Sequence, residues 1–208
     1  MAMQNDPTEA EEKQKQVDEK DKIIVPEQKL KEDPRVIDLI QNVDDRGYLY
    51  EIIHGSDEYL DKFGQVYVVG DPVRNTIRAF HAHEELWDYF HIVKGSAKFI
   101  LFPKEAMDLA TREQTDGTLE AIAKGKLNYP GGKEVDSLSF MKGQTFILTD
   151  RKPQCLIVPA GWYHGWKSLE DDTIMISTAN REYNQEKPDE TRISPFVLGK
   201  EVWEMTKK

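Results

Sequence analysis

Short β-type runs separated by turn residues fill the chain from Val36 to Ser177, and this pattern limits the fold classes that the chain can adopt. The runs are rich in β-branched and aromatic residues, and turn signals recur about every ten residues. Such spacing is typical of an all-β barrel or sandwich. The predicted strands are residues 36–40, 48–53, 65–69, 76–83, 87–93, 97–102, 137–141, 145–148, 155–158 and 173–177.

The segments around this β core predict one domain with a tail. Residues 1–34 are dominated by Glu, Asp, Lys and Gln and contain no aromatic residue, so we expect a disordered tail. Residues 35–208 form the predicted domain. Within it, 103–136 reads as an insertion over one edge, a helix over 104–110 followed by a Gly-rich loop. Residues 181–208 are predicted to wrap the surface, with a final helix-like piece at 200–208 that packs Val202 and Trp203 onto the barrel.

Charge and cysteine usage limit the partners and the compartment. The net charge of −10 and the pI near 5.1 argue against a nucleic-acid-binding surface. The single cysteine, Cys155, lies in an apolar run and cannot form an internal disulfide, which fits a buried thiol in a reducing compartment. The sequence contains no apolar stretch of signal-peptide or membrane-spanning length. We therefore expect a cytoplasmic protein that does not bind nucleic acid or a membrane.

Three histidines and one carboxylate form the main candidate site. His81 and His83 alternate on one predicted strand, so both side chains face the same side. Four residues separate His83 from Asp88, and a Pro159-x-Gly161-x-x-His164 element comes later. With Gly95, this pattern resembles the cupin double motif, with Asp88 where Glu is usual. We expect Asp88 on the next strand and His164 across the barrel, which makes either a divalent-metal site (Fe, Mn, Ni or Zn) or an acid–base pocket.

Three separated segments resemble the dTDP-4-dehydrorhamnose 3,5-epimerase family. They are Arg78-Ala-Phe-His81, Ile157-Val-Pro-Ala-Gly-Trp-Tyr-His164-Gly165 and the earlier Asp45-Arg46-Gly47-Tyr-Leu-Tyr-Glu51. The resemblance implies the cupin fold, a double-stranded β-helix or jelly roll with short peripheral helices, and a homodimer. It also implies a metal-free reaction on a nucleotide sugar, in which a proton beside the C4 ketone is removed and then replaced on the other face.

The resemblance assigns roles to residues of this chain. His81 would be the general base, a task that suits a neutral imidazole near pH 7. Arg78 would bind the diphosphate or help to hold the enolate. His164 would line the pocket near the sugar, Arg46 would contact the nucleotide phosphates, and Glu51 would contact the nucleotide end.

The chain departs from the family at several of its functional positions. The pocket lysine falls at Asp88, and the proton-donating tyrosine falls at Ser177. Tyr183 matches a second, supporting tyrosine, and Ser177 and Tyr183 are kept as substrate-binding candidates. The family's late aspartate has no counterpart in 193–199, where Asp189 and Glu190 lie nearby but out of register.

Residues 78–90 match most closely the motif of epimerase-related cupins, which are associated with nucleotide-sugar and surface-polysaccharide pathways. Three functions stay open on the sequence alone. The first is a nucleotide-sugar epimerase or isomerase with His81 as base and no required cofactor. The second is a metal-dependent cupin enzyme with His81, His83, Asp88 and His164 as ligands. The third is a non-catalytic sugar-binding cupin. Asp88 could instead pair with Arg78 or Lys98, and His91 reads as an ordinary packed histidine.

Overall fold

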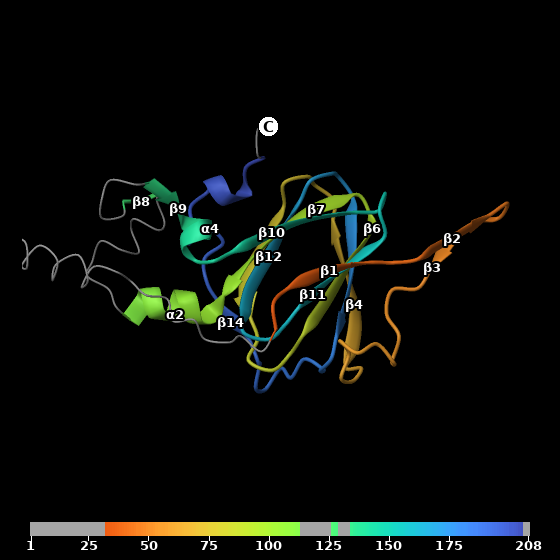
Figure 1. Cartoon of the computed structure of the whole chain (residues 1–208), viewed down its shortest axis with the longest axis horizontal. Coiled ribbons are helices and arrows are strands. Elements are labelled where there is room, and N and C mark those ends of the chain that lie inside the picture. Colours follow the sequence, from red (N-terminus) through yellow and green to blue (C-terminus); the bar gives the residue numbers. More distant parts are fainter. Residues whose placement is uncertain (1–31, 113–125, 129–133, 206–208) are drawn as a thin grey trace, which may run out of the picture.

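Two five-stranded antiparallel sheets face each other in the computed structural model, which describes residues 32–112, 126–128 and 134–205 (Figure 1). The predicted all-β jelly roll is therefore confirmed. Nearly all of the predicted tail, up to residue 31, lies outside the described residues, as do 113–125 and 129–133 of the predicted insertion.

The first sheet contains the strands that carry Asp88 and Ser177. Its order is β1 (Arg35–Asp38), β11 (Gln154–Val158), β6 (Asp88–Lys94), β13 (Thr173–Ala179) and β4 (Gln65–Asp71). The second sheet contains the strands of the histidines. Its order is β10 (Gln144–Thr149), β7 (Ser96–Pro103), β12 (Trp162–Ser168), β5 (Ile77–Ala82) and β14 (Thr191–Arg192). Sequence-distant segments thus become neighbours, and this is how the site is assembled.

Three apolar clusters hold these layers together. The central one lies between the sheets and includes Phe90, Phe99, Leu101 and Trp166. A second covers the outer face of the β5–β12–β7 sheet, and a third packs against the outer face of β6 and β11 around Tyr89. Because β7 has apolar clusters on both of its faces, every one of its residues is buried. The rigid centre of the fold therefore lies directly beside the predicted site.

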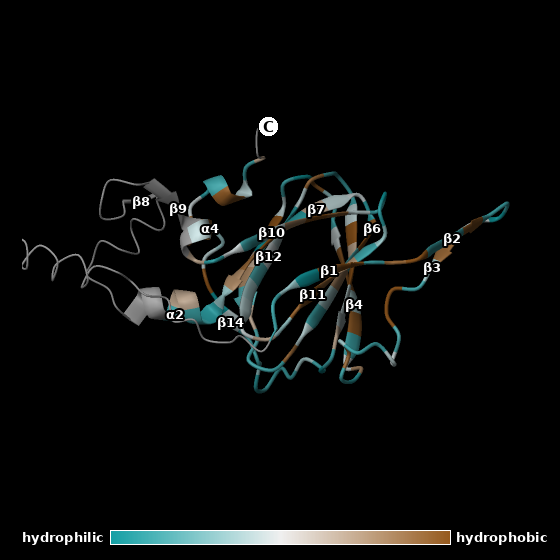
Figure 2. Ribbon diagram, viewed as in Figure 1, coloured by the Kyte–Doolittle hydropathy of each residue, from teal (hydrophilic) through white to brown (hydrophobic). Residues whose placement is uncertain are grey.

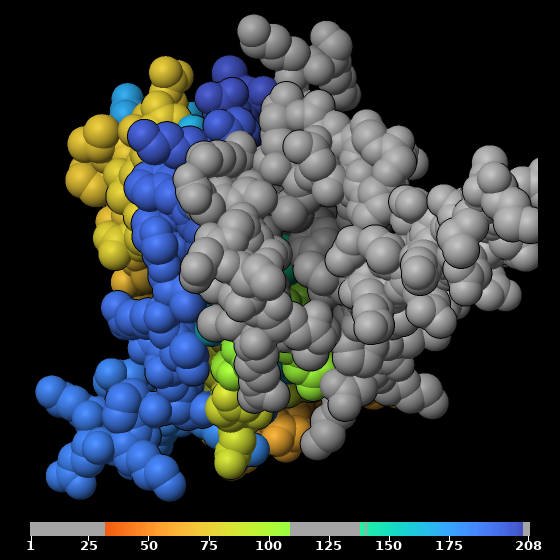
Figure 3. Space-filling model, turned by 90° about the vertical axis from the view of Figure 1, so that its left-hand side faces the viewer, coloured from red at the N-terminus to blue at the C-terminus, as the bar shows by residue number. Residues whose placement is uncertain are grey.

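The peripheral elements follow the predictions in part. The helix α2 (Lys104–Arg112) is confirmed, and the short strands β8 (Lys126–Asn128) and β9 (Glu134–Asp136) form a small hairpin in the insertion. Near the C-terminus the described residues form a 3-10 turn (Glu201–Trp203) where a helix over 200–208 was predicted, and 206–208 lie outside the described residues. Trp203 stacks on Phe80 as expected of a packing residue. In Figure 3 the C-terminal segment (blue) runs beside the part of the chain coloured yellow, which the bar places near residue 75. Its strand β14 pairs with β5.

The predicted strand at 137–141 is wrong: the helical turn α4 (Ser137–Phe140) occupies it. The run alternates like a strand, but Leu138 and Met141 also have the i, i+3 spacing of one helix face, and both join the cluster outside the second sheet. The Gly143 amide donates to the Leu138 carbonyl at 2.8 Å and closes the turn.

A hairpin projects from the first sheet. It consists of β2 (Gln41–Asp44) and β3 (Gly47–Tyr50), and both strands carry hydrophobic residues away from the barrel (Figure 2). Val43 is 73% exposed and Tyr48 is 69% exposed. Among the described residues, no helix is long and apolar enough to cross a membrane.

Candidate active site

A cavity of about 600 Å³ opens between the two sheets, and its lining includes residues of the edge strands β4 and β14 and of β5, the neighbour of β14. This volume is within the usual range of small-molecule sites. Both sheets contribute to its wall, together with the segment after β13. The polar and charged side chains on this wall include Tyr67, Arg78, His81, His83, Asp88, Tyr183, Glu190 and Arg192.

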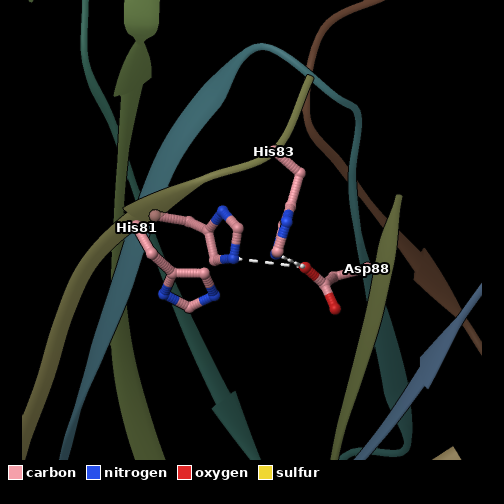
Figure 4. A group of neighbouring side chains, drawn as sticks. His81, His83 and Asp88 are labelled. Atoms are coloured by element: carbon pink, nitrogen blue, oxygen red, sulfur yellow. Dashed lines mark ion pairs between the residues drawn. The ribbon is translucent and has the colours of Figure 1, made fainter. Parts of the chain in front are cut away.

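The four predicted ligands come together at one end of this cavity. One nitrogen or oxygen from each of His81, His83, Asp88 and His164 lies within 4.8 Å of the others. Figure 4 shows His81, His83 and Asp88 in one group, and the ion-pair lines, from His83 and His164, end on the Asp88 carboxylate. This convergence agrees with the grouping expected from the sequence.

The arrangement across the sheets differs from the expectation. His164 on β12 pairs directly with His81 on β5, so it is a neighbour in the same sheet and not across the barrel. Asp88 begins β6 in the facing sheet and is the residue that reaches across. His164 is only 3% exposed and lies behind the cavity wall, with its ring 4.1 Å from that of His81. It therefore supports the wall rather than lining it.

Two glycines allow this close approach. Gly161 has φ +87°, in the left-handed region that favours glycine, and its amide donates to the His83 carbonyl at 2.8 Å. Gly165 lies against β5, where an added Cβ would be 2.2 Å from the Ala79 Cβ. The Pro-x-Gly turn thus fixes the start of β12 beside His83, and Gly165 lets β12 pack tightly on the strand of His81.

Backbone carbonyls set the tautomers of two histidines. His164 Nδ1 donates to the Trp162 carbonyl at 3.0 Å, and His83 Nδ1 donates to the Asp189 carbonyl. Because a carbonyl only accepts, both Nδ1 atoms carry the proton and both Nε2 atoms face Asp88. The distances to Asp88 Oδ2 are 3.3 Å from His164 and 3.6 Å from His83.

Buried lone pairs consequently converge without a partner. Asp88 Oδ2 and His164 Nε2 are both buried and have no hydrogen bond among the described residues. Leaving such groups unpaired is costly, so the geometry calls for a proton or a cation between them. Backbone carbonyls that hold Nδ1 while Nε2 faces inward are also the usual outer support of a metal site.

His81 is held as a neutral imidazole. Burial lowers its pKa, and the neighbouring His164, His83 and Arg192 lower it further. An uncharged imidazole has a lone pair available at neutral pH, which suits both proton abstraction and metal binding.

Two arginines bring positive charge to the cavity. Arg78 donates from Nε to Asp71 Oδ1 at 2.8 Å, and its guanidinium stays half exposed while Asp71 is buried. Arg192 on β14 is the register partner of His81 and pairs with Glu190 at 2.8 Å. Arg192 was not predicted from the sequence, because a two-residue strand in a polar tail leaves no periodic signal.

Tyr67 is a second functional candidate that the sequence analysis missed. It lies on β4 with Ser177 as its partner on β13, and its side chain lines the cavity. Burial of its hydroxyl end and the nearby Asp88 raise the pKa of the phenol. Ser177 is fully buried, donates to Asp88 Oδ1 at 3.4 Å and does not line the cavity, so the wall position expected of Ser177 belongs to Tyr67.

The remaining predicted residues separate into two groups. Tyr183 lines the cavity mouth, whereas Arg46 and Glu51 do not line the cavity. Arg46 pairs with Asp44 at the tip of the β2–β3 hairpin, and Glu51 pairs with His54. The structure therefore does not bring Arg46 and Glu51 to the cavity of their own chain.

Neither of the alternative partners considered for Asp88 takes that role. Arg78 binds Asp71, and Lys98 donates to the carbonyls of Val202 and Glu204. His91 is buried and contacts the Gln154 carbonyl and the Tyr50 hydroxyl, so it is the packed histidine that the sequence indicated.

Asp189 has a structural role next to the cluster. Its carboxylate accepts hydrogen bonds from the amides of Glu84, Glu85 and Leu86, at 2.9, 2.9 and 3.0 Å. Burial opposes ionisation of Asp189, but these amides hold its pKa below the ordinary value. The contact is with the loop after His83 and not with His81, so Asp189 does not replace the family aspartate that orients the base.

The fold is that of the dTDP-sugar epimerases of the cupin type. A solved dTDP-4-dehydrorhamnose 3,5-epimerase from Bacillus anthracis str. Ames, with TDP and PPi bound, superposes with a TM-score of 0.54 at 16% identity. The match covers 77% of this chain and 78% of that chain. Other structures of the same fold are a dTDP sugar isomerase, a 3'-monoepimerase and a sugar 3,4-ketoisomerase.

Two sequence relatives are proteins of polysaccharide or glycan biosynthesis. The spore coat polysaccharide biosynthesis protein SpsL of Bacillus subtilis is 27% identical over 160 residues, covering 76% of this chain and 86% of the relative. The probable low-salt glycan biosynthesis epimerase Agl13 of Haloferax volcanii is 26% identical over 164 residues, covering 77% and 86%. No family model matches the sequence. The neighbours are thus sugar epimerases, isomerases and glycan-biosynthesis proteins, in agreement with the resemblance found in the sequence.

Proposed function

We propose that this chain is a nucleotide-sugar epimerase or isomerase of a glycan biosynthesis pathway. Its substrate would be a dTDP-4-keto-6-deoxyhexose or a similar sugar nucleotide. The observation that carries the proposal is a single cavity with a neutral imidazole, His81, and two guanidinium groups, Arg78 and Arg192, on its wall. The dTDP-sugar epimerases and isomerases among its structural neighbours support this choice of substrate class.

The roles follow from the charges in the cavity. His81 takes the proton from the carbon next to the sugar ketone, because it is the uncharged base on the wall. Arg78 and Arg192 supply the positive charge that a diphosphate and a developing enolate oxygen require. His164 packs against His81 from behind and fixes its ring, which makes His164 a positioning residue.

Deuterium exchange tests the proposal. In D₂O the wild-type protein is expected to incorporate deuterium at C3 or C5 of dTDP-4-keto-6-deoxyglucose, measured by NMR. His81→Ala should reduce this exchange by at least about 100-fold, the usual contribution of a general base. The exposed His54 lies outside the cavity, so His54→Ala is the matched control. Binding of the sugar nucleotide without exchange would instead support a non-catalytic sugar-binding cupin.

A metal-dependent enzyme is the second candidate, and the unpartnered atoms Asp88 Oδ2 and His164 Nε2 favour it. His81, His83, Asp88 and His164 fit a divalent ion in the type and number of their donor atoms. When bound, such an ion would act as a Lewis acid on a substrate oxygen.

Metal content tests the second candidate. After removal of bound metal and reconstitution with Zn, Mn, Fe or Ni, elemental analysis should find about one ion per chain if the second candidate is correct. Asp88→Asn and His83→Ala should then lose the ion, whereas His54→Ala should keep it. At a free metal concentration of about 100 Kd the ion would stabilise the fold by about 2.7 kcal/mol. No bound ion after reconstitution would eliminate this candidate.

We also propose a homodimer that uses the β2–β3 hairpin. Its apolar side chains Val43, Tyr48 and Leu49 are exposed, and β4 is an edge strand with Val66 and Val68 exposed. A second copy would cover these residues and remove an exposed sheet edge. Sedimentation should give about twice the chain mass, and Leu49→Glu should shift it toward the monomer. A wild-type monomer at micromolar concentration would contradict the proposal.

A further inference from the structure

We propose that Tyr67 is the catalytic acid that returns the proton to the substrate, on the face opposite His81. This inference rests on the proposed epimerase function and assigns a residue to a step for which the sequence offered only Ser177. It starts from the position of Tyr67, on the sheet facing that of His81 and on the wall of the same cavity.

The alternation of β4 turns Tyr67 inward. Val66 and Val68 on either side of it are exposed on the outer face, whereas Gln65, Tyr67 and Val69 line the cavity. The 38% exposure of Tyr67 is therefore surface toward the cavity. A phenol held in this way presents an O–H group to a ligand between the sheets.

The reaction itself requires groups on two faces. An epimerase removes a proton from one face of a carbon and delivers one to the other, so a base and an acid must flank the substrate. His81 on β5 and Tyr67 on β4 come from the two sheets that enclose the cavity. The other imidazoles are occupied: the Nδ1 protons of His83 and His164 are bound to carbonyls, and their Nε2 atoms face Asp88.

The protons and electrons balance in two steps. His81 accepts the proton, the C–H electron pair becomes the enolate π bond, and the carbonyl oxygen takes the negative charge. The enolate carbon then forms a new C–H bond with the Tyr67 proton, the ketone is restored, and the electron pair of the O–H bond stays on Tyr67 as phenolate. Exchange with water in the open cavity returns the proton to Tyr67 and removes the one on His81.

The experiment separates proton removal from proton delivery. Wild type and variants are incubated with dTDP-4-keto-6-deoxyglucose in D₂O, and deuterium incorporation and epimer formation are measured separately by NMR. Tyr67→Phe should keep incorporation within about threefold of wild type, because His81 can return a deuteron to the same face, and should lose epimer formation by at least about 100-fold. Tyr163→Phe, which removes a tyrosine hydroxyl from the packed outer side of β12, should leave both rates unchanged.

Each other outcome overturns the assignment. Epimer formation that persists in Tyr67→Phe excludes Tyr67 as the acid, and its loss in Tyr183→Phe alone would give the role to the tyrosine at the cavity mouth. Equal loss of incorporation and epimer formation in Tyr67→Phe, with dTDP binding and thermal unfolding unchanged, would make Tyr67 a substrate-positioning residue. Failure of the proposed function is distinct: the wild-type protein would then show no incorporation, and the assignment would fall with it.

Discussion

Replacing Gly165 with alanine should destabilise the fold at the point where β12 and β5 carry the histidines. The new Cβ would lie 2.2 Å from the Ala79 Cβ, 2.7 Å from the Ala79 Cα and 3.0 Å from the Arg78 carbonyl oxygen. Two carbon atoms prefer a separation of about 3.5–4.0 Å, so the strands must move apart by roughly 1 Å. The nearest atoms belong to the backbone and to a short side chain, which cannot turn away.

The expected cost is about 3 kcal/mol, at the upper end of the range for overpacked sites. For a chain of this size this lowers Tm by about 6–12 °C. Chemical denaturation followed by tryptophan fluorescence measures the free energy of unfolding. Since His164 precedes Gly165 and pairs with His81, deuterium incorporation by the folded variant should fall as well.

Two further variants test whether the close approach of β12 to β5 causes the expected destabilisation. Gly70→Ala on β4 is the matched control, because nothing lies within 4 Å of an added Cβ there, and it should change stability by less than about 0.5 kcal/mol. Adding Ala79→Gly to Gly165→Ala removes the shortest contact and should recover about 1 kcal/mol or more in a double-mutant cycle. If Gly165→Ala costs no more than Gly70→Ala, or the cycle shows no coupling, the proposed close approach of β12 to β5 is refuted.

Three further variants test the supports of the site. Asp71→Asn should weaken dTDP binding roughly tenfold in calorimetry, because Arg78 loses its charged partner; unchanged affinity would contradict that role. Asp189→Asn should lower the free energy of unfolding by roughly 2 kcal/mol at pH 7. Since the pKa of Asp189 is lowered on folding, this difference should shrink as pH falls below 3.8, and a difference independent of pH would exclude the charge as its cause. Trp203→Ala should cost about 3–5 kcal/mol in denaturation, because Trp203 is buried on Phe80; a loss below 1 kcal/mol would contradict that packing.

Local periodicity explains what the sequence predicted correctly. A strand alternates its side chains whatever it pairs with, so His81 and His83 could be assigned to one face before any partner was known. The sheet that a strand joins depends on contacts far apart in the chain. Nothing local to Asp88 or His164 indicates that Asp88 faces the histidines and His164 neighbours them.

The same distinction explains the two main errors. Over five residues, the 137–141 run fits both a two-residue and a helical period, and the hydrogen bond from Gly143 to Leu138 favours the helical turn. Tyr67 reads as one aromatic residue in an ordinary β run, and only the pairing of β4 with β13 places it beside Ser177. In the comparison with the family motif, Ser177 occupies the position of the missing tyrosine. In the folded chain, the hydroxyl that reaches the cavity belongs to Tyr67 on the adjacent strand β4.

The epimerase and the metal-dependent enzyme would both need the lone pair of the His81 imidazole. A neutral imidazole has a single lone pair, so while the lone pair of His81 binds an ion it cannot also accept the substrate proton. His83, Asp88 and His164 converge through Nε2, Oδ2 and Nε2 without His81, and they would suffice as three protein ligands. Metal binding that survives His81→Ala would therefore let both chemistries coexist in one cavity. Metal binding lost in His81→Ala would make them alternatives, and an ion found in active protein would then exclude His81 as the base.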